Sequence, residues 1–478
     1  MTLKSPPRWC KGNPCNACMP RVTSCAPLSM LMTCLSFAMA CNPLHSVRDE
    51  SDIMTAAAAD AERWSIQGQS SLTSYWWRQL HDPRLDEAIE AVLEKNLQLQ
   101  QVLFRVRQAQ ALARIAGSSR WPTASVTVNR SHTGRRAFPG QFGIIDDATL
   151  SMNAAFEVDM WNRLGDLTKA AELRAVAAQS DAEVLGLTLT ATFVSTWVDL
   201  AESHETAALL SEQISTNKTL LDLASFRFAA GLATAADVLQ QKQQLLATKG
   251  LMPNVKGQRA RAENQLAVLS GMTPATFQPP KRVELVNPGV LPELGMPADL
   301  LLRRPDLKAA RQRVQAADFD IGAALAAYLP ALRLTAQGGL PVSSMSSFID
   351  RLLWTVGASL SQPILDGGRI EADASEKKAA LDVALLEFRQ TFLVAVREVE
   401  DALKLELASD ARIENLVAEL DVAQSLLTET RRRYGAGLST YLPVLNAVRA
   451  FQGKERELVA AKGQRLRVRI QLLRALAG

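Results

Sequence analysis

Arg433-Tyr434-Gly435-Ala436-Gly437-Leu438-Ser439-Thr440-Tyr441-Leu442-Pro443-Val444-Leu445 is the stretch that decides the fold. It resembles, position by position, an earlier stretch of the chain: Arg227-Phe228-Ala229-Ala230-Gly231-Leu232-Ala233-Thr234-Ala235-Ala236-Asp237-Val238-Leu239. Arg, Ala, Gly, Leu, Thr, Val and Leu recur at matching positions, and an aromatic residue follows the arginine in both. Such self-similarity indicates that the chain is built from two related copies.

Each stretch is typical of a tight turn between two helices. Gly231 and Gly437 can adopt the left-handed conformation that ends a helix. Thr234 and Thr440 are good N-caps for a helix that starts at once. Asp237 lies three residues after Thr234, near a capping-box spacing. We therefore predict one long helical hairpin in each copy, with one of these turns at its tip.

The turns are approached by unusually long runs without proline. No proline occurs between Leu164 and Gly231, and at ~1.5 Å per residue such a run spans roughly 100 Å as a helix. Every third or fourth position from Leu164 to Thr196 is uncharged and mostly small, which indicates a heptad-like packing seam. A shorter helix is predicted from Pro83 to about Ala116, with Asp82 as its cap. Beyond Cys41, no apolar run long enough for a transmembrane helix is expected.

Both copies contain a segment in which apolar and polar residues alternate. The predicted strands are residues 125–129 and 150–159 in the first copy and 332–337 and 354–361 in the second. Aromatic residues gather near the strand ends: Trp121, Trp161 and Tyr328 at one end, and Phe138, Phe142, Phe348 and Trp354 at the other. The pattern fits either a soluble sheet or membrane-spanning strands with aromatic girdles. Four strands cannot close a barrel in lipid, so in a membrane several chains must close it together.

The N-terminus has the features of an export signal. Residues 1–40 contain four basic residues and no acid, and from Val22 to Ala40 they are uncharged and mostly apolar. The sequence Ala38-Met39-Ala40-Cys41 is similar to a bacterial lipobox, which predicts lipidation at Cys41; cleavage elsewhere by an ordinary signal peptidase is the alternative. Met19 is a second candidate start. Without this segment the 53 basic residues fall to 49, equal to the acidic ones, which argues against nucleic acid as a partner.

The distribution of prolines and the two copies predict the domain boundaries in the rest of the chain. Seven prolines between residues 274 and 305 indicate a linker of packed irregular structure. The expected domains are a signal peptide at 1–40, a lipidated N-terminal segment at 41–80, a first repeat at 81–273, the Pro-rich linker at 274–305 and a second repeat at 306–478.

Four motifs together resemble one protein family. They are Trp76-Trp77 with Asp82-Pro83-x-Leu85, Arg303-Arg304-Pro305-Asp306, Gln362-Pro363-Ile364-Leu365-Asp366-Gly367-Gly368-Arg369, and Tyr434-x-x-Gly437-Leu438-x-Thr440. The combination resembles the TolC-like outer-membrane efflux proteins, in their OprM/NodT-type lipoprotein branch. The resemblance covers about residues 60 to 470.

This resemblance implies a mainly α-helical fold with transmembrane β-strands. Three chains would form a twelve-stranded barrel in the outer membrane and a long helical tunnel across the periplasm. It also implies a periplasmic adaptor protein and an inner-membrane pump of the RND class as partners, and the lipid of the outer membrane as surroundings. The implied function is a passive trimeric duct that exports small molecules, as the outer-membrane component of a tripartite efflux system.

Carried over by motif position, the two tip turns would form the periplasmic aperture. Candidate aperture residues are Arg227, Thr234, Asp237, Tyr434, Thr440 and Asn446, and the tip turns are at Gly231 and Gly437. Pro443 and Asn446 stand where some relatives have acidic residues, so a strong acidic ring is not expected. The simpler interpretation is that Thr234 and Asp237 only cap a helix and that Tyr434 only packs between helices.

Residues for catalysis, metal binding or a cofactor are not apparent. The four histidines are scattered, none belongs to an HExxH motif, and no glycine-rich phosphate loop occurs. We therefore expect no enzymatic activity, no metal and no cofactor. The alternative to a duct is a structural coiled-coil lipoprotein of the envelope that forms no pore.

Overall fold

The computed structural model describes residues 76–137, 141–291, 303–341 and 353–476. The signal peptide and Cys41 lie outside these ranges, as do Phe138, Phe348 and the side chain of Phe142. In chain order the elements are η1 (Trp76–Leu80), α3 (Pro83–Lys95), α4 (Leu97–Ser118), β1 (Thr123–Ala137), β2 (Gln141–Val158), α5 (Arg163–Ala229), α6 (Ala235–Leu269), α8 (Pro305–Ala326), β3 (Ala331–Pro341), β4 (Leu353–Ser361), α9 (Arg369–Gly435) and α10 (Tyr441–Leu476).

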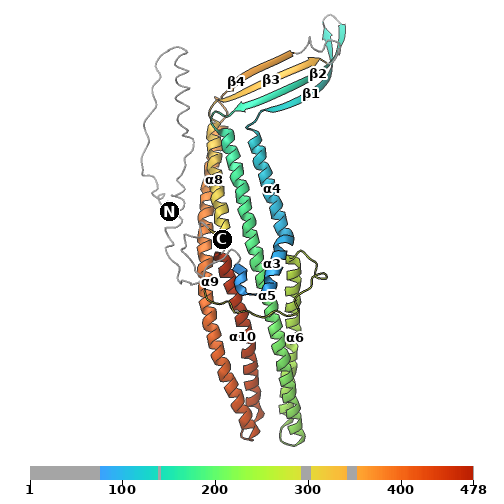
Figure 1. Ribbon diagram of the computed structural model, residues 1–478, viewed down its shortest axis with the longest axis vertical. Coiled ribbons are helices and arrows are strands. Elements are labelled where there is room, and N and C mark those ends of the chain that lie inside the picture. Colours follow the sequence, from blue (N-terminus) through green and yellow to red (C-terminus); the bar gives the residue numbers. More distant parts are fainter. Residues whose placement is uncertain (1–75, 138–140, 292–302, 342–352, 477–478) are drawn as a thin grey trace, which may run out of the picture. The chain divides into compact units, whose positions relative to one another are not determined.

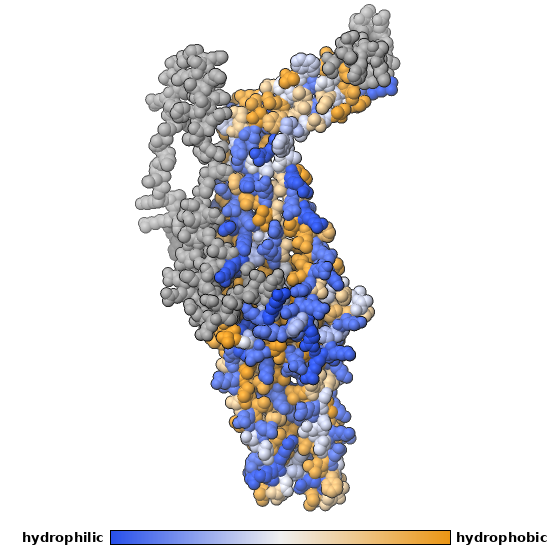
Figure 2. All heavy atoms as spheres, in the orientation of Figure 1, coloured by the Kyte–Doolittle hydropathy of each residue, from blue (hydrophilic) through white to orange (hydrophobic). Residues whose placement is uncertain are grey.

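Four antiparallel strands form a single sheet in the order β1-β2-β3-β4 (Figure 1). The register aligns Val126, Met152, Gly338 and Trp354 across all four strands, and cross-strand partners share a face. Three of these side chains are exposed although they are apolar. Figure 2 shows hydrophobic surface gathered over the strands. The predicted strands are thus confirmed, and their apolar face is not covered by the chain's own helices.

The long helices are also confirmed. α5 and α9 contain 67 residues each, and α6 and α10 contain 35 and 36. α5 lies beside α6, and α9 beside α10 (Figure 1). Along the predicted seam of α5, Leu164, Thr168, Ala175 and Leu189 are buried. The small side chains among them, Thr168 and Ala175, allow neighbouring helices to approach closely.

The prediction of one helix from Pro83 to about Ala116 is wrong. The backbone leaves the helical conformation at Asn96, where φ is −63° and ψ is 124°, and two helices result. The Asn96 side chain accepts from the backbone N–H of Leu99 at 3.0 Å and so caps α4. Its amide donates to the carbonyl of Leu269 at 2.8 Å. A partner far along the chain therefore fixes the break.

The main core surrounds the middle of α5. Trp76, Ile89, Phe193, Leu200 and Leu266 are almost completely buried in it. In the described ranges, α5 has one segment that is long and apolar enough to cross a membrane by length and composition alone, contrary to the expectation of none. Because 56% of that segment is buried inside the protein, its apolar residues are accounted for by this core.

Candidate functional site

The two tip turns lie where the sequence predicts them, at Gly231 and Gly437. The backbone φ is 71° at Gly231 and 75° at Gly437. Both values lie in the left-handed region, which glycine adopts without steric cost. The Thr234 hydroxyl accepts from the backbone N–H of Asp237 at 3.2 Å, and the Asp237 carboxylate accepts from the backbone N–H of Thr234 at 2.9 Å. This complete capping box at the start of α6 is sufficient to explain the positions of both residues.

The structure brings two of the candidate aperture residues together. The guanidinium of Arg227, in the last turn of α5, lies 4.6 Å from the centre of the Tyr434 ring. The Tyr434 ring also packs on Tyr441, with 5.4 Å between ring centres. Arginine over an aromatic face is attracted by the ring quadrupole. The stack of Arg227, Tyr434 and Tyr441, here called the tip stack, joins the first copy to the second.

Both polar ends of this contact are partly unsatisfied. In the described part of the chain, the buried Nε of Arg227 and the buried hydroxyl of Tyr434 have no hydrogen-bond partner. The Tyr441 hydroxyl instead donates to the side chain of Gln241 on α6. Burial raises the pKa of Tyr441 to about 12, and Tyr434 and Asp237 act in the same direction. Tyr441 therefore stays a neutral donor at any physiological pH.

A buried polar network, which was not predicted from the sequence, continues from the tip stack. Asn217 and Gln452 exchange two side-chain hydrogen bonds of 3.1 and 3.2 Å between α5 and α10. Asn217 also donates to Thr248 at 2.9 Å, and Gln241 donates to the carbonyl of Asn217 at 2.9 Å. Buried amides with all partners in place fix helix register. Within α6, Gln241 and Thr248 are seven residues apart and share one helical face, but the sequence alone does not distinguish them from solvated polar residues.

The remaining candidates lie apart from the tip stack. Thr440 directly precedes α10 and is exposed, and Asn446 is exposed on α10. Leu438, in the second tip turn, is also exposed. Within the ranges that the structure describes, no group of three or more His, Cys, Asp or Glu side chains could hold a metal ion.

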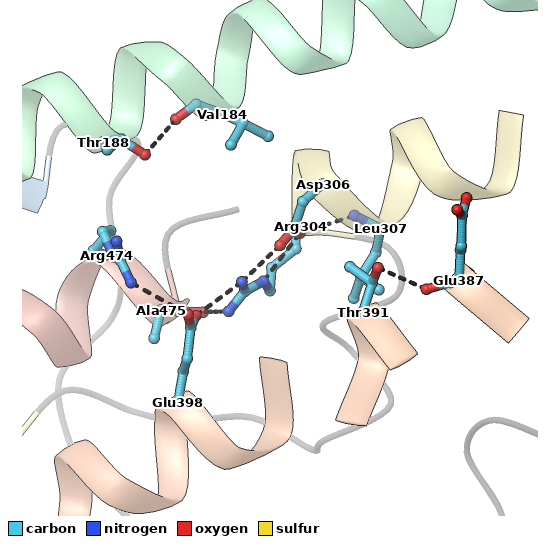
Figure 3. Close-up of polar contacts among 10 residues, drawn as sticks. All are labelled: Val184, Thr188, Arg304, Asp306, Leu307, Glu387, Thr391, Glu398, Arg474 and Ala475. Carbon is cyan, nitrogen blue, oxygen red and sulfur yellow. Dashed lines mark hydrogen bonds and ion pairs between the residues drawn. The ribbon is translucent and has the colours of Figure 1, made fainter. Parts of the chain in front are cut away.

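The Arg303-Arg304-Pro305-Asp306 motif forms a second polar centre, at the start of α8 (Figure 3). Arg304 pairs with Asp306 at 2.7 Å and with Glu398 of α9 at 3.0 Å. It also donates to the carbonyl of Ala475 at 3.2 Å, near the end of α10. Arg474 completes the group by pairing with Glu398 at 3.4 Å. The motif therefore joins the start of α8 to α9 and to the last turn of α10, where a cation also complements the helix dipole.

Comparison with known families gives a match over most of the chain. The sequence model of one family, described as "Outer membrane efflux protein", matches residues 88–272 and 296–478. The chain is 27% identical over 463 residues to the pyoverdine export outer membrane protein OpmQ of Pseudomonas aeruginosa, covering 94% of this chain and 96% of OpmQ. It is 29% identical to outer membrane protein OprJ of the same organism over 439 residues, or 88% and 91% of the two chains.

Solved structures agree with the fold. The outer-membrane channel OprN superposes with a TM-score of 0.82 at 24% identity, covering 88% of this chain and 97% of that one. A membrane protein of Pseudomonas aeruginosa has a TM-score of 0.79 at 26% identity, with 86% and 96% covered.

Proposed function

Because the chain belongs to the outer membrane efflux protein family, we propose that three copies assemble into one duct through the outer membrane and the periplasm. The sheet is the observation that carries the proposal. Its apolar face is exposed, and within the described residues β1 and β4 each pair on one side only. In lipid such edges must be paired. Four strands per copy leave the edge strands β1 and β4 running in opposite directions, so every junction between copies is antiparallel.

The width of the barrel argues against two copies, and the family implies three. Two copies would supply eight strands, and eight-stranded barrels are filled by their own side chains. Three copies supply twelve, which leaves room for a lumen. OpmQ is named for pyoverdine export and OprJ as an outer membrane protein. By analogy this chain conducts small molecules without catalysing a reaction. Its proposed partners are a periplasmic adaptor and an inner-membrane pump of the RND class, which supplies the energy.

The tip stack is the proposed closing contact of this duct. Arg227 belongs to the first hairpin and Tyr434 to the second, so the hairpins separate only when this contact is lost. A cation–π contact of ~0.5–2 kcal/mol would bias the closed state by roughly 2- to 30-fold per copy. Tyr441 and the polar network around Asn217 join α10 of the second hairpin to α5 and α6 of the first.

Bilayer conductance tests both the duct and its closing contact. The purified chain should elute from detergent with the mass of three copies and give discrete conductance steps. Arg227→Ala should raise the open fraction. Tyr434→Phe is the matched control and should leave it unchanged, because the Tyr434 hydroxyl has no partner in the described structure. A water-soluble monomer without conductance would refute the duct, whereas a wild-type open fraction in Arg227→Ala would refute only the closing role.

The non-pore alternative, a structural coiled-coil envelope lipoprotein, gains no support from the family match. Both interpretations share the expectation of a lipid anchor at Cys41. That anchor would hold the chain at the outer membrane while its long helices extend into the periplasm.

A further inference from the structure

The turn between β4 and α9 presents two apolar side chains to solvent. Ile364 is 97% exposed and Leu365 is 93% exposed. The Asp366 carboxylate accepts from the backbone N–H groups of Gly368 and Ile370, at 3.0 Å each. The two glycines after Asp366 have φ values of 68° and 84°. The turn is thus built around hydrogen bonds and left-handed glycines, and it holds its two largest apolar side chains away from the chain.

The helices next to the sheet follow the same order as the strands. α4 packs on α5, α5 on α8, and α8 on α9. Each of these helices leads into or out of the strand at the matching position, from α4 with β1 to α9 with β4. α4 and β1 therefore lie at one edge of this layer, and α9 and β4 at the other (Figure 1).

Both edge helices carry exposed apolar residues on one face. In α4 these are Phe104, Leu112 and Ile115, and in α9 they are Val383, Leu386 and Leu393. Spacings of eight and three residues in α4, and of three and seven in α9, place each set on a single helical face. Apolar stripes at both edges are unusual for surfaces that stay in water.

We propose that the Ile364–Leu365 turn of one copy docks on the C-terminal half of α4 of the next copy, around Leu112 and Ile115. This inference rests on the proposed trimeric duct. Closing the barrel pairs the edge of β4 with the edge of β1 from the next copy. The residues just after β4 then meet the residues just before β1.

The reach of the turn agrees with this position. The four residues from Gln362 to Leu365 span at most ~13 Å when extended. On the other side of the junction, residues 119–122 separate α4 from β1, and Ile115 lies three residues before the end of α4, or ~5 Å along its axis. The two apolar groups therefore come to the same level below the barrel. A lipid surface would account for the exposed turn beside the strands, but not for apolar stripes that continue along both edge helices.

The experiment measures assembly of the full chain in detergent. Replacing both residues, Ile364→Ser with Leu365→Ser, should raise the protein concentration needed for half-assembly at least ~10-fold, as judged by light scattering. Val290→Ser is the control, since Val290 is 70% exposed in the linker between the repeats. Its assembly should equal that of the wild type.

Disulfide trapping locates the contact, because all native cysteines lie between Cys10 and Cys41 and none lies near the turn or α4 in the sequence. Leu365→Cys with Ile115→Cys should cross-link two chains under mild oxidation. Leu365→Cys alone, and its combination with Leu97→Cys at the far end of α4, should not. Unchanged assembly of the double serine variant without cross-linking would overturn the docking. So would intact trimers that bind phospholipid vesicles less well. A wild-type chain that stays monomeric would instead overturn the proposed duct.

Discussion

At the scale of single residues, the ion pair between Glu406 of α9 and Arg469 of α10 is almost completely buried. Their side chains are 0% and 3% exposed. Arg469 also donates to the carbonyls of Pro288 and Val290, at 2.9 Å each. One guanidinium thus satisfies a buried carboxylate and two backbone carbonyls. The pair fixes residues 288–290 against α9 and α10.

We expect Glu406→Leu to destabilise the protein by about 3–5 kcal/mol, because it leaves a buried cation without its carboxylate. The double variant with Arg469→Met should lose less than the sum of the two single variants. Thermal unfolding followed by circular dichroism measures both. Glu429→Gln, which breaks an exposed pair with Arg432, should cause no measurable change. Strictly additive losses at 406 and 469 would show that the two side chains do not depend on each other.

At the scale of elements, the sequence predicted a feature correctly wherever that feature depends on residues close together in the chain. Gly231 and Gly437, the capping box at Thr234 and the alternation in the strands all depend on residues a few positions apart, and each was predicted correctly. The break at Asn96 was not predicted, because it is stabilised by a hydrogen bond to Leu269, which lies 173 residues further along the chain. The polar network around Asn217 and the Glu406 pair were missed for the same reason. In a helix, a polar residue at a buried position looks like any solvated one until its partner is known.

Two glycines near the end of α9, Gly435 and Gly437, differ in backbone conformation, and substituting each one tests how that conformation stabilises the second tip turn. Gly437 has a φ of 75°, whereas Gly435 lies within α9, and an added Cβ would meet no atom within 4 Å at either position. Gly437→Val should therefore cost at least ~1–2 kcal/mol through the backbone alone. Gly435→Ala should be neutral or slightly stabilising. Limited proteolysis of the tip, with cleavage rates compared between the variants, distinguishes them; equal rates would contradict a backbone origin.

At the scale of the whole molecule, the chain combines a barrel segment, long helical hairpins and an expected lipid anchor. Its place in the outer membrane follows from the family, and the anchor at Cys41 remains a prediction from the sequence. Cys41→Ser should remove acyl chains from the mature protein and weaken its attachment to membranes. Intact-mass spectrometry and labelling with palmitate measure this. An unchanged mass and undiminished label would mean that Cys41 is not acylated.

The equal lengths of α5 and α9, 67 residues in each repeat, constrain how such a chain can change over time. Both hairpins have to end at the same depth for Arg227 to reach Tyr434. A deletion of seven residues in one helix would keep its packing face but shorten that helix by ~10 Å. Where α5 packs on α6 and α9 on α10, we therefore expect the tip contact to survive a change in length only when all four helices change together. The chain thus sets the depth of its tips twice, and we expect an insertion or deletion in one hairpin to be kept only together with its equivalent in the other.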